Sequence, residues 1–286
     1  VSFRRFVLPA LPVVVNHMAA SAIGAMLSVA GGNADGVPSN VFYSLDLCHV
    51  ENGWEPLPGF PGVQRVQPVL VAQKSNGGTT GVHSFGMQLS QTGVADRIES
   101  NSSNTGDEFC LFLAGGFQPA VGEEPDPAPT EVLMYSPLAK QWTQVSVLPS
   151  FPDGSLRTLT GGAGVAYSDS LILFAGGVNY DRFLAAVDRP RQIEAVSRKG
   201  DEQALELLQK EAAEYMSHPV EWYRFNQSLL IYHTETGQWT ETDAYEPFAR
   251  AGAGVVVYKN RLIVVNGELK PGIRTPEVNC FMIAFF

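Results

Sequence analysis

The stretch Leu-Ile-Leu-Phe-Ala-Gly-Gly at 171–177 decides the fold of this chain of 286 residues. The same pattern, an apolar run that ends in Gly-Gly, occurs at 26–32 (MLSVAGG) and at 109–116 (FCLFLAGG). Each copy continues with a strand that contains a tyrosine, and a tryptophan closes it: Trp54, Trp142 and Trp239. A pattern that returns in phase along the chain predicts a repeat protein.

A fourth copy lies near the end of the chain, where RLIVVNGE (261–268) precedes EVNCFMIAFF (277–286). In this copy Asn-Gly replaces Gly-Gly, and no tryptophan follows. A short apolar strand precedes each copy: AASAIGAM (19–26), RVQPVLVAQ (65–73), GGAGVAYSD (161–169) and AGAGVVVYKN (251–260). Four strands per copy predict a four-stranded antiparallel sheet. One such sheet cannot bury both of its faces, so we expect the sheets to pack side by side.

These features predict an all-β chain that forms one β-propeller over residues 1–286, with one sheet, or blade, per copy. The expected blades span roughly 12–60, 61–150, 151–245 and 246–286. Two segments interrupt the repeat. Residues 74–108 are rich in polar residues and glycine, which predicts a surface loop. Residues 187–217 contain DEQALELLQKEAAEYM, whose helix formers at helical spacing predict a helix or helix pair inserted in the third blade.

The composition argues against several classes of partner. Lys and Arg total 19 against 29 Asp and Glu, a formal net charge of −10, and such a surface repels a nucleic acid backbone. No apolar run reaches the roughly 20 residues of a membrane-spanning helix. The three cysteines, Cys48, Cys110 and Cys280, are far apart, and Cys and His form no cluster with metal-ligand spacing. We therefore expect three free thiols and no structural metal site.

The direction of the strands places certain loops on one face of the predicted propeller. Adjacent strands run in opposite directions, so the loops between blades share a face with the loops between the second and third strands of each blade. Four arginines lie in these loops: Arg65, Arg157, Arg250 and Arg274. Guanidinium groups suit a carboxylate or a phosphate, so we expect an anion-binding mouth on this face. The alternative is that each arginine pairs with a nearby carboxylate and holds the blades together.

The segment LIVVNGELKPGIRTPEV (262–278) makes a family resemblance specific. Together with GGVNYDRFLAA (176–186), the helical insertion and HPVEWYRFNQSLLIYHTETGQW (218–239), it resembles the sialic acid mutarotase, or N-acetylneuraminate epimerase, family. The resemblance covers roughly residues 12–286, and FYSLDL followed by GWEPLPGFPGVQRVQP is most similar to the circularly permuted branch of that family.

The resemblance implies a kelch-type β-propeller of six blades, of which four are visible in this chain. Two more blades would then precede Val1. VSFRRFVLP (1–9) would form the outer strand of the last missing blade. Alternatively, a strand over 2–8 would join the fourth blade and close a smaller ring.

The resemblance also implies an isomerase that interconverts the α and β anomers of N-acetylneuraminate, a small-molecule sialic acid, without a cofactor. It suggests a periplasmic or secreted protein, although this chain shows no signal peptide. The functional glutamate and arginine of the family motif correspond to Glu268 and Arg274. Ring opening needs a proton removed from the anomeric hydroxyl and one given to the ring oxygen, so Glu268 is the candidate acid/base and Arg274 the candidate carboxylate clamp. The further candidate ligands are Arg65, Arg157, Arg250 and Asn179.

Three other functions are compatible with a β-propeller. A non-catalytic module would bind a protein or carbohydrate partner. Glu268 and Arg274 would then point away from the central channel of the propeller, around which the blades are arranged. A copper oxidase would need a Tyr, His and Cys ligand set, and the five histidines show no convincing cluster. A sialidase would need repeated S-x-D-x-G-x-x-W motifs, which the sequence lacks. Nothing in the sequence indicates the oligomeric state.

Overall fold

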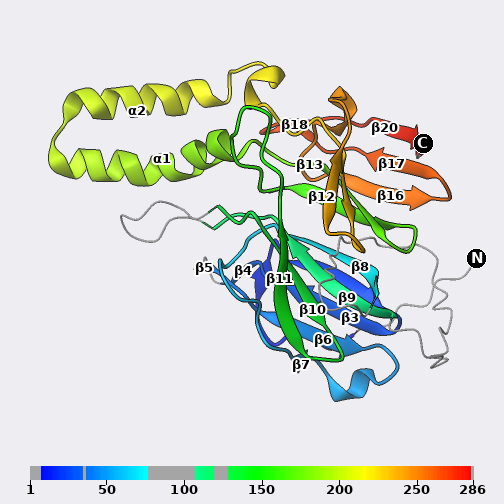
Figure 1. Cartoon of the computed structure of the whole chain (residues 1–286). Coiled ribbons are helices and arrows are strands. Elements are labelled where there is room, and N and C mark those ends of the chain that lie inside the picture. The colour runs from blue at the N-terminus through cyan, green and yellow to red at the C-terminus, as the bar shows by residue number, and fades with distance from the viewer. Residues whose placement is uncertain (1–7, 35–36, 77–106, 119–127, 285–286) are drawn as a thin grey trace, which may run out of the picture.

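The structure, a computed structural model, describes residues 8–34, 37–76, 107–118 and 128–284. Four antiparallel sheets follow one another along the chain, and a pair of helices projects from them (Figure 1). Most of the predicted polar loop, residues 77–106, and residues 2–7 of the predicted N-terminal strand lie outside the described residues.

The first two sheets, which we call blades 1 and 2, have four strands each, ordered as they occur in the chain. Blade 1 contains β2 (Ala19–Ile23), β3 (Met26–Ala30), β6 (Phe42–Asp46) and β7 (Glu55–Pro56). Blade 2 contains β8 (Val69–Asn76), β9 (Asp107–Ala114), β10 (Glu131–Ser136) and β11 (Gln141–Val147). In blade 2, Tyr135 lies opposite Trp142 in the antiparallel register, so the spacing of seven residues between them is that of a β-hairpin.

Blades 3 and 4 follow the same order. Blade 3 contains β12 (Gly162–Tyr167), β13 (Leu171–Gly176), β14 (Leu230–His233) and β15 (Gln238–Glu241). Blade 4 contains β16 (Gly254–Tyr258), β17 (Arg261–Val265) and β20 (Val278–Met282). The shorter elements are β1 (Val15–Asn16), β4 (Asn33–Ala34), β5 (Val37–Pro38), β18 (Glu268–Lys270) and β19 (Ile273–Arg274), with 3-10 helices η1 (Val50–Asn52), η2 (Val220–Tyr223) and η3 (Glu246–Phe248).

The first strands of the four blades lie next to one another. Strand β2 contacts β8, β8 contacts β12, and β12 contacts β16. The later strands of each blade lie progressively farther from this centre, which is the arrangement of a β-propeller (Figure 1). The sheets therefore confirm the predicted fold class, and the six blades that the resemblance implies remain a prediction.

The repeated tryptophans attach each blade to the preceding part of the chain. Trp142 of blade 2 donates a hydrogen bond from Nε1 to the carbonyl of Pro58, at 2.9 Å. Trp239 of blade 3 donates one to Oγ of Ser146 in blade 2, also at 2.9 Å. The ring of Trp142 also packs edge-on against Phe42 of blade 1, with centroids 5.1 Å apart. Each tryptophan thus supplies buried apolar area and satisfies its N–H across a blade boundary.

The Gly-Gly pairs let the loop that enters the next blade approach closely. Gly176 and Gly177 have φ values of 72° and 99°, in the left-handed region that favours glycine. Gly177 donates its N–H to the carbonyl of Arg250 at 2.8 Å, and a Cβ on Gly176 would lie 2.3 Å from that same oxygen. Gly32 bonds to Arg65 and Gly116 to Thr158 in the same way, at 2.8 and 2.9 Å.

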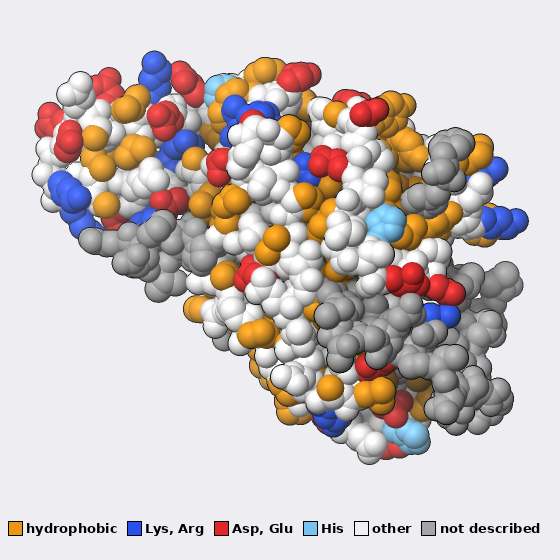
Figure 2. Space-filling model, in the orientation of Figure 1, with side chains coloured by type: hydrophobic (Ala, Val, Ile, Leu, Met, Phe, Trp, Pro, Cys, Tyr) orange, Lys and Arg blue, Asp and Glu red, His pale blue; other side chains and the backbone are white. Residues whose placement is uncertain are grey.

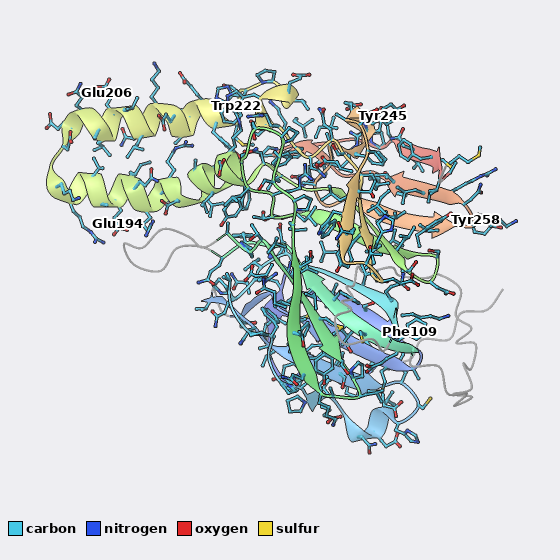
Figure 3. The ribbon with its side chains drawn as sticks, viewed as in Figure 1. Phe109, Glu194, Glu206, Trp222, Tyr245 and Tyr258 are labelled. Carbon is cyan, nitrogen blue, oxygen red and sulfur yellow. The ribbon has the colours of Figure 1, made fainter. Side chains whose placement is uncertain are left out.

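The insertion in blade 3 is a pair of helices between β13 and β14: α1 (Tyr180–Lys199) and α2 (Glu202–Tyr215). Asn179 caps α1 by accepting a hydrogen bond from the N–H of Arg182 at 3.2 Å. The helical pair carries charged side chains of both signs (Figure 2). Glu194 and Glu206 lie on its projecting part, and Trp222 lies at its base (Figure 3). Within the described ranges, we find no helix with the length and apolar character needed to cross a membrane.

Candidate functional site

A cavity of about 900 Å³ opens where the first strands of the four blades begin. The blades contribute residues at matching positions: Met18 and Ala19, Pro68 and Val69, Gly162 and Ala163, Ala253 and Gly254. Backbone hydrogen bonds connect neighbouring blades at this rim, from Gln67 N–H to the His17 carbonyl at 2.9 Å and from Gly252 N–H to the Gly161 carbonyl at 2.7 Å. The start of α1 and the β18–β19 hairpin form another wall.

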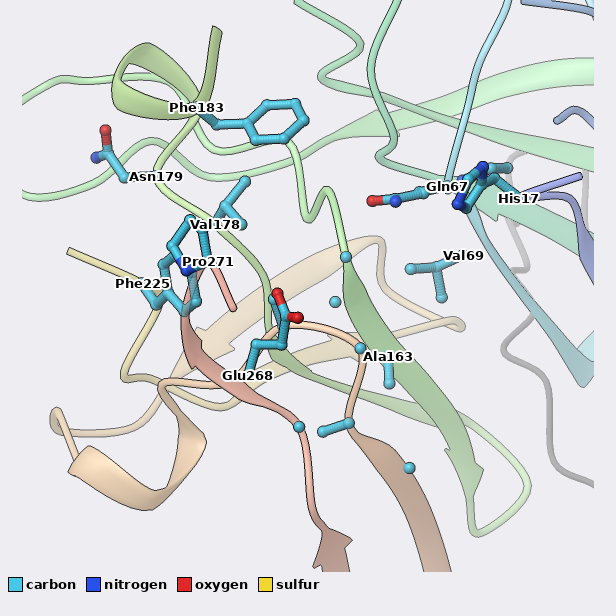
Figure 4. A pocket seen from close by; sticks show the side chains of 18 of the residues that line it. His17, Gln67, Val69, Ala163, Val178, Asn179, Phe183, Phe225, Glu268 and Pro271 are labelled. Carbon is cyan, nitrogen blue, oxygen red and sulfur yellow. The ribbon is translucent and has the colours of Figure 1, made fainter. Parts of the chain in front are cut away.

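Glu268 points its carboxylate into this cavity (Figure 4). The view shows Phe225 and Pro271 on one side of Glu268, and Gln67 and His17 across the cavity (Figure 4). The side chain of Glu268 is 31% exposed, so it is partly shielded from water while remaining open to a ligand.

The backbone of Glu268 is held tightly. Its N–H donates to the carbonyl of Ala251 at 2.7 Å, and its own carbonyl accepts from the N–H of Ala251 at 3.0 Å. The preceding residues, Asn266 and Gly267, have φ values of 55° and 105°. A Cβ on Gly267 would lie 3.0 Å from Cβ of Arg250, so only a glycine fits easily there. The Asn-Gly turn therefore directs the chain, and with it Glu268, to the channel.

Arg274 forms an ion pair with Glu268. The two residues lie opposite each other in the β18–β19 hairpin, and Nη2 of Arg274 is 2.8 Å from Oε1 of Glu268. Both residues line the cavity, although the Arg274 side chain is 74% exposed. This arrangement differs from the one expected of a non-catalytic module, in which both side chains would point away from the channel.

Arg65, Arg157 and Arg250 are not among the residues that line the cavity, and this corrects the prediction that they form an anion-binding mouth. They are 0%, 2% and 2% exposed. Each forms an ion pair with a glutamate of its own blade: Arg65 with Glu131 at 3.2 Å, Arg157 with Glu241 at 2.8 Å, and Arg250 with Glu277 at 2.7 Å. A buried guanidinium needs such a partner to offset the loss of water.

These arginines act as structural anchors between blades. Their side chains attach the entering loop to its own blade, while the carbonyls of Arg65 and Arg250 accept hydrogen bonds from the Gly-Gly pair of the preceding blade. The alternative weighed for the sequence, in which the arginines hold the blades together, is the one that the structure supports.

Three other polar residues of the site have identifiable partners. Asn179 lines the cavity, but its side-chain oxygen caps α1. His17 lines the opposite side, and its Nδ1 lies 2.9 Å from Oδ1 of Asn16. Lys270 donates from Nζ to the carbonyls of Met216 and His218 at 3.1 and 2.6 Å, which ties the β18–β19 hairpin to the end of the helical insertion.

Sequence reasoning missed Arg182 and Phe183, which line the cavity from the first turn of α1. The predicted insertion began at residue 187, so both residues fell in a presumed loop. A signal was present, because Asn179 followed by Asp181 is typical of a helix N-terminus.

The cysteines and metal-ligating residues show no clustering in the described parts of the chain. Cys48, Cys110 and Cys280 are free thiols, as predicted. In the same ranges no three side chains of the types His, Cys, Asp and Glu come together as a group that could hold a metal ion.

Comparison with known proteins places the chain in a family. The model of the family described as N-acetylneuraminate epimerase matches residues 87–284. The chain belongs to this family. Among curated proteins, the N-acetylneuraminate epimerase of Salmonella paratyphi B is 27% identical over 246 residues, covering 85% of this chain and 50% of the relative. That of Haemophilus influenzae (strain PittEE) is 26% identical over 278 residues, covering 95% and 58%.

The N-acetylneuraminate epimerase family assignment agrees with a structural match. The solved structure described as "Structure of YjhT" has a TM-score of 0.65 and 20% sequence identity, and the match covers 96% of this chain and 68% of that one. The fold is thus a kelch-type β-propeller. The chain spans about half the length of the curated relatives that it matches.

Proposed function

We propose that this chain carries the catalytic site of a sialic acid mutarotase, an isomerase that interconverts the α and β anomers of N-acetylneuraminate. The observation that supports this most strongly is the Glu268 carboxylate, directed into the propeller cavity and paired with Arg274 at 2.8 Å, in a member of the N-acetylneuraminate epimerase family. A periplasmic or secreted setting, as the resemblance implies, is part of the proposal.

The reaction requires proton transfers at two oxygens. The anomeric hydroxyl loses its proton, the bond between the anomeric carbon and the ring oxygen breaks, and the ring oxygen gains a proton. The resulting open-chain keto acid rotates about the bond beside its carbonyl and closes on the other face. No electrons are gained or lost overall, so acid/base groups suffice.

We assign Glu268 as the acid/base group that takes the proton of the anomeric hydroxyl and gives it to the ring oxygen as the ring bond breaks. Ring closure reverses both transfers. Arg274 is a positioning residue in this scheme, because its ion pair fixes one oxygen of the Glu268 carboxylate. The partial burial of Glu268 limits competing hydrogen bonds from water.

The substitution Glu268→Gln tests this assignment, because it keeps the size and hydrogen bonding of the side chain and removes the base. We expect the rate of anomer exchange, measured by NMR, to fall about 100-fold or more, with sugar binding retained. The control is Glu206→Gln on the exposed side of α2, which should leave the rate unchanged. Binding without any exchange in the unaltered chain would favour the carbohydrate-binding alternative instead.

A further inference from the structure

The charges that face the cavity do not all have partners. Of the described residues that line it, three are fully charged at neutral pH: Arg182, Glu268 and Arg274. Glu268 and Arg274 neutralise each other in their ion pair. A sugar acid brings one more negative charge into this space, and Arg182 is the cation that remains to meet it.

Arg182 differs from the other arginines around the helical insertion. Arg189 pairs with Glu211 at 3.5 Å, and Arg224 pairs with Asp153 at 2.7 Å. Within the described parts of the chain, no Asp or Glu lies within ion-pair distance of Arg182. With no carboxylate partner among the described residues, the guanidinium at the cavity wall is available to a ligand.

The guanidinium of Arg182 is nevertheless held in place. Its Cζ lies 4.2 Å from the centroid of the Trp222 ring, in a cation–π contact. The Trp222 ring is itself stacked on His218, with centroids 3.9 Å apart and planes 10° from parallel. A guanidinium that stacks through its face keeps its N–H groups free at the edge, where they can form the two parallel hydrogen bonds that a carboxylate accepts.

Arg274 is less suited to hold the carboxylate of the substrate. A second carboxylate on the same guanidinium would lie beside the carboxylate of Glu268, and two like charges at such a distance repel each other. Arg182 reaches the cavity from a different element, the first turn of α1. Val178 and Phe183, which flank that turn, lie on the side of the cavity toward which the Glu268 carboxylate points (Figure 4).

We propose that Arg182 binds the carboxylate of the sugar acid and that Arg274 instead positions Glu268. This inference rests on the proposed function and makes it more specific, because it gives the helical insertion a direct part in substrate recognition. Arg182 also borders a second cavity of about 570 Å³, which it shares with Asn179 and Tyr215. The bound carboxylate would therefore lie where the propeller channel meets the insertion.

The test compares the binding of N-acetylneuraminate with that of its methyl ester, which has the same ring but no negative charge. Dissociation constants are measured by calorimetry for the unaltered chain and for Arg182→Gln. We expect Arg182→Gln to weaken binding of the acid about 10- to 100-fold and to leave binding of the ester unchanged. Arg198→Gln is the matched control, because Arg198 lies on the same helix, is paired with Glu194 and lines neither cavity, and it should change neither constant.

A second variant covers the case in which Arg182→Gln misfolds. Arg182→Lys keeps the charge but loses the planar fork, so we expect a smaller loss, again confined to the acid. Equal binding of the acid by the unaltered chain, Arg182→Gln and Arg182→Lys would overturn the inference, as would a loss of equal size for acid and ester.

The outcomes separate this inference from the proposed function. Exchange that depends on Glu268 but not on Arg182 would overturn the inference alone. Binding of the acid that depends on Arg182, without any anomer exchange, would overturn the proposed function and support Arg182 as the anion-binding residue. A chain that binds neither compound would overturn both.

Discussion

Arg65, Arg157 and Arg250, the buried arginines at the blade boundaries, each form an ion pair with one glutamate. Arg65 is fully buried. It forms an ion pair with the carboxylate of Glu131 at 3.2 Å and donates a hydrogen bond to the carbonyl of the same residue at 3.1 Å. Because the guanidinium has no access to water, loss of either partner leaves the other without its main interaction.

Replacement of Arg65 by Met should therefore destabilise the chain by about 3–5 kcal/mol, the usual cost of breaking a buried ion pair. The control is Lys140→Met, which removes an exposed pair with Glu55 at 3.4 Å and should cost less than about 1 kcal/mol. Urea unfolding of both variants checks this. Equal losses in the two variants would show that Arg65 is not an anchor.

The three thiols differ in exposure and so in reactivity. Burial raises the pKa of the Cys110 thiol, and the charge of nearby Glu108 raises it further, whereas Cys48 and Cys280 are exposed. In the folded chain we expect two thiols to react quickly with a thiol reagent and the third to react only after unfolding.

The pH dependence of this reaction follows from the same shift. Raising the pH from about 7 to about 9 should not speed the reaction of Cys110 with a thiol reagent in the folded chain, because burial holds the pKa of this thiol well above that range. Cys110 stays protonated over this range in the folded chain. Fast reaction of all three thiols before unfolding would contradict the burial of Cys110.

At the scale of single residues, the sequence identified the candidate site residues, but it did not identify the ion-pair partners of the arginines. Glu268 and Arg274 were found through the family motif, and both line the cavity. The role of Arg157 and Arg250 was misjudged because their glutamate partners lie 84 and 27 residues farther along the chain. Only the pairing of strands within a blade brings those charges together.

Among the structural elements, the Gly-Gly turns place each blade against the next. Gly176 and Gly200 have nearly the same φ, 72° and 71°, but different surroundings. A Cβ on Gly176 would lie 2.3 Å from the Arg250 carbonyl, while one on Gly200, at the end of α1, would meet nothing within 4 Å.

Gly200→Ala should therefore cost only the strain of the left-handed backbone, about 1–2 kcal/mol. Gly176→Ala adds a clash with the neighbouring blade, so we expect it to cost at least about 2 kcal/mol more. Thermal and urea unfolding of the two variants measure the difference. If both variants lose the same stability, the close approach at Gly176 does not hold the blades together.

The helical insertion shows why the bounds of an element are harder to predict than its existence. The helix-forming residues of α2 are plain in the sequence, and α2 ends at Tyr215. α1 begins at Tyr180, before the expected 187, and it contains Pro190, a residue that normally interrupts helices. Because α1 begins earlier than predicted, Arg182 was not recognised from the sequence as a helical residue that lines the cavity.

At the scale of the whole molecule, the repeats made the propeller predictable. Every copy must fit the same kind of neighbour, so a glycine-containing turn recurs in all four copies and the tryptophan recurs in the first three. The cavity could not be predicted in the same way, because it combines the rims of four blades with an insertion that belongs to none of the repeats.

The most direct measurement of the central claim follows the α anomer of N-acetylneuraminate by NMR as it converts to the equilibrium mixture. In the presence of this chain we predict faster conversion, a rate proportional to chain concentration, and the same final ratio of anomers, because an isomerase changes the rate and not the equilibrium. A conversion rate equal to that in buffer alone, at every concentration of folded chain, would contradict the account.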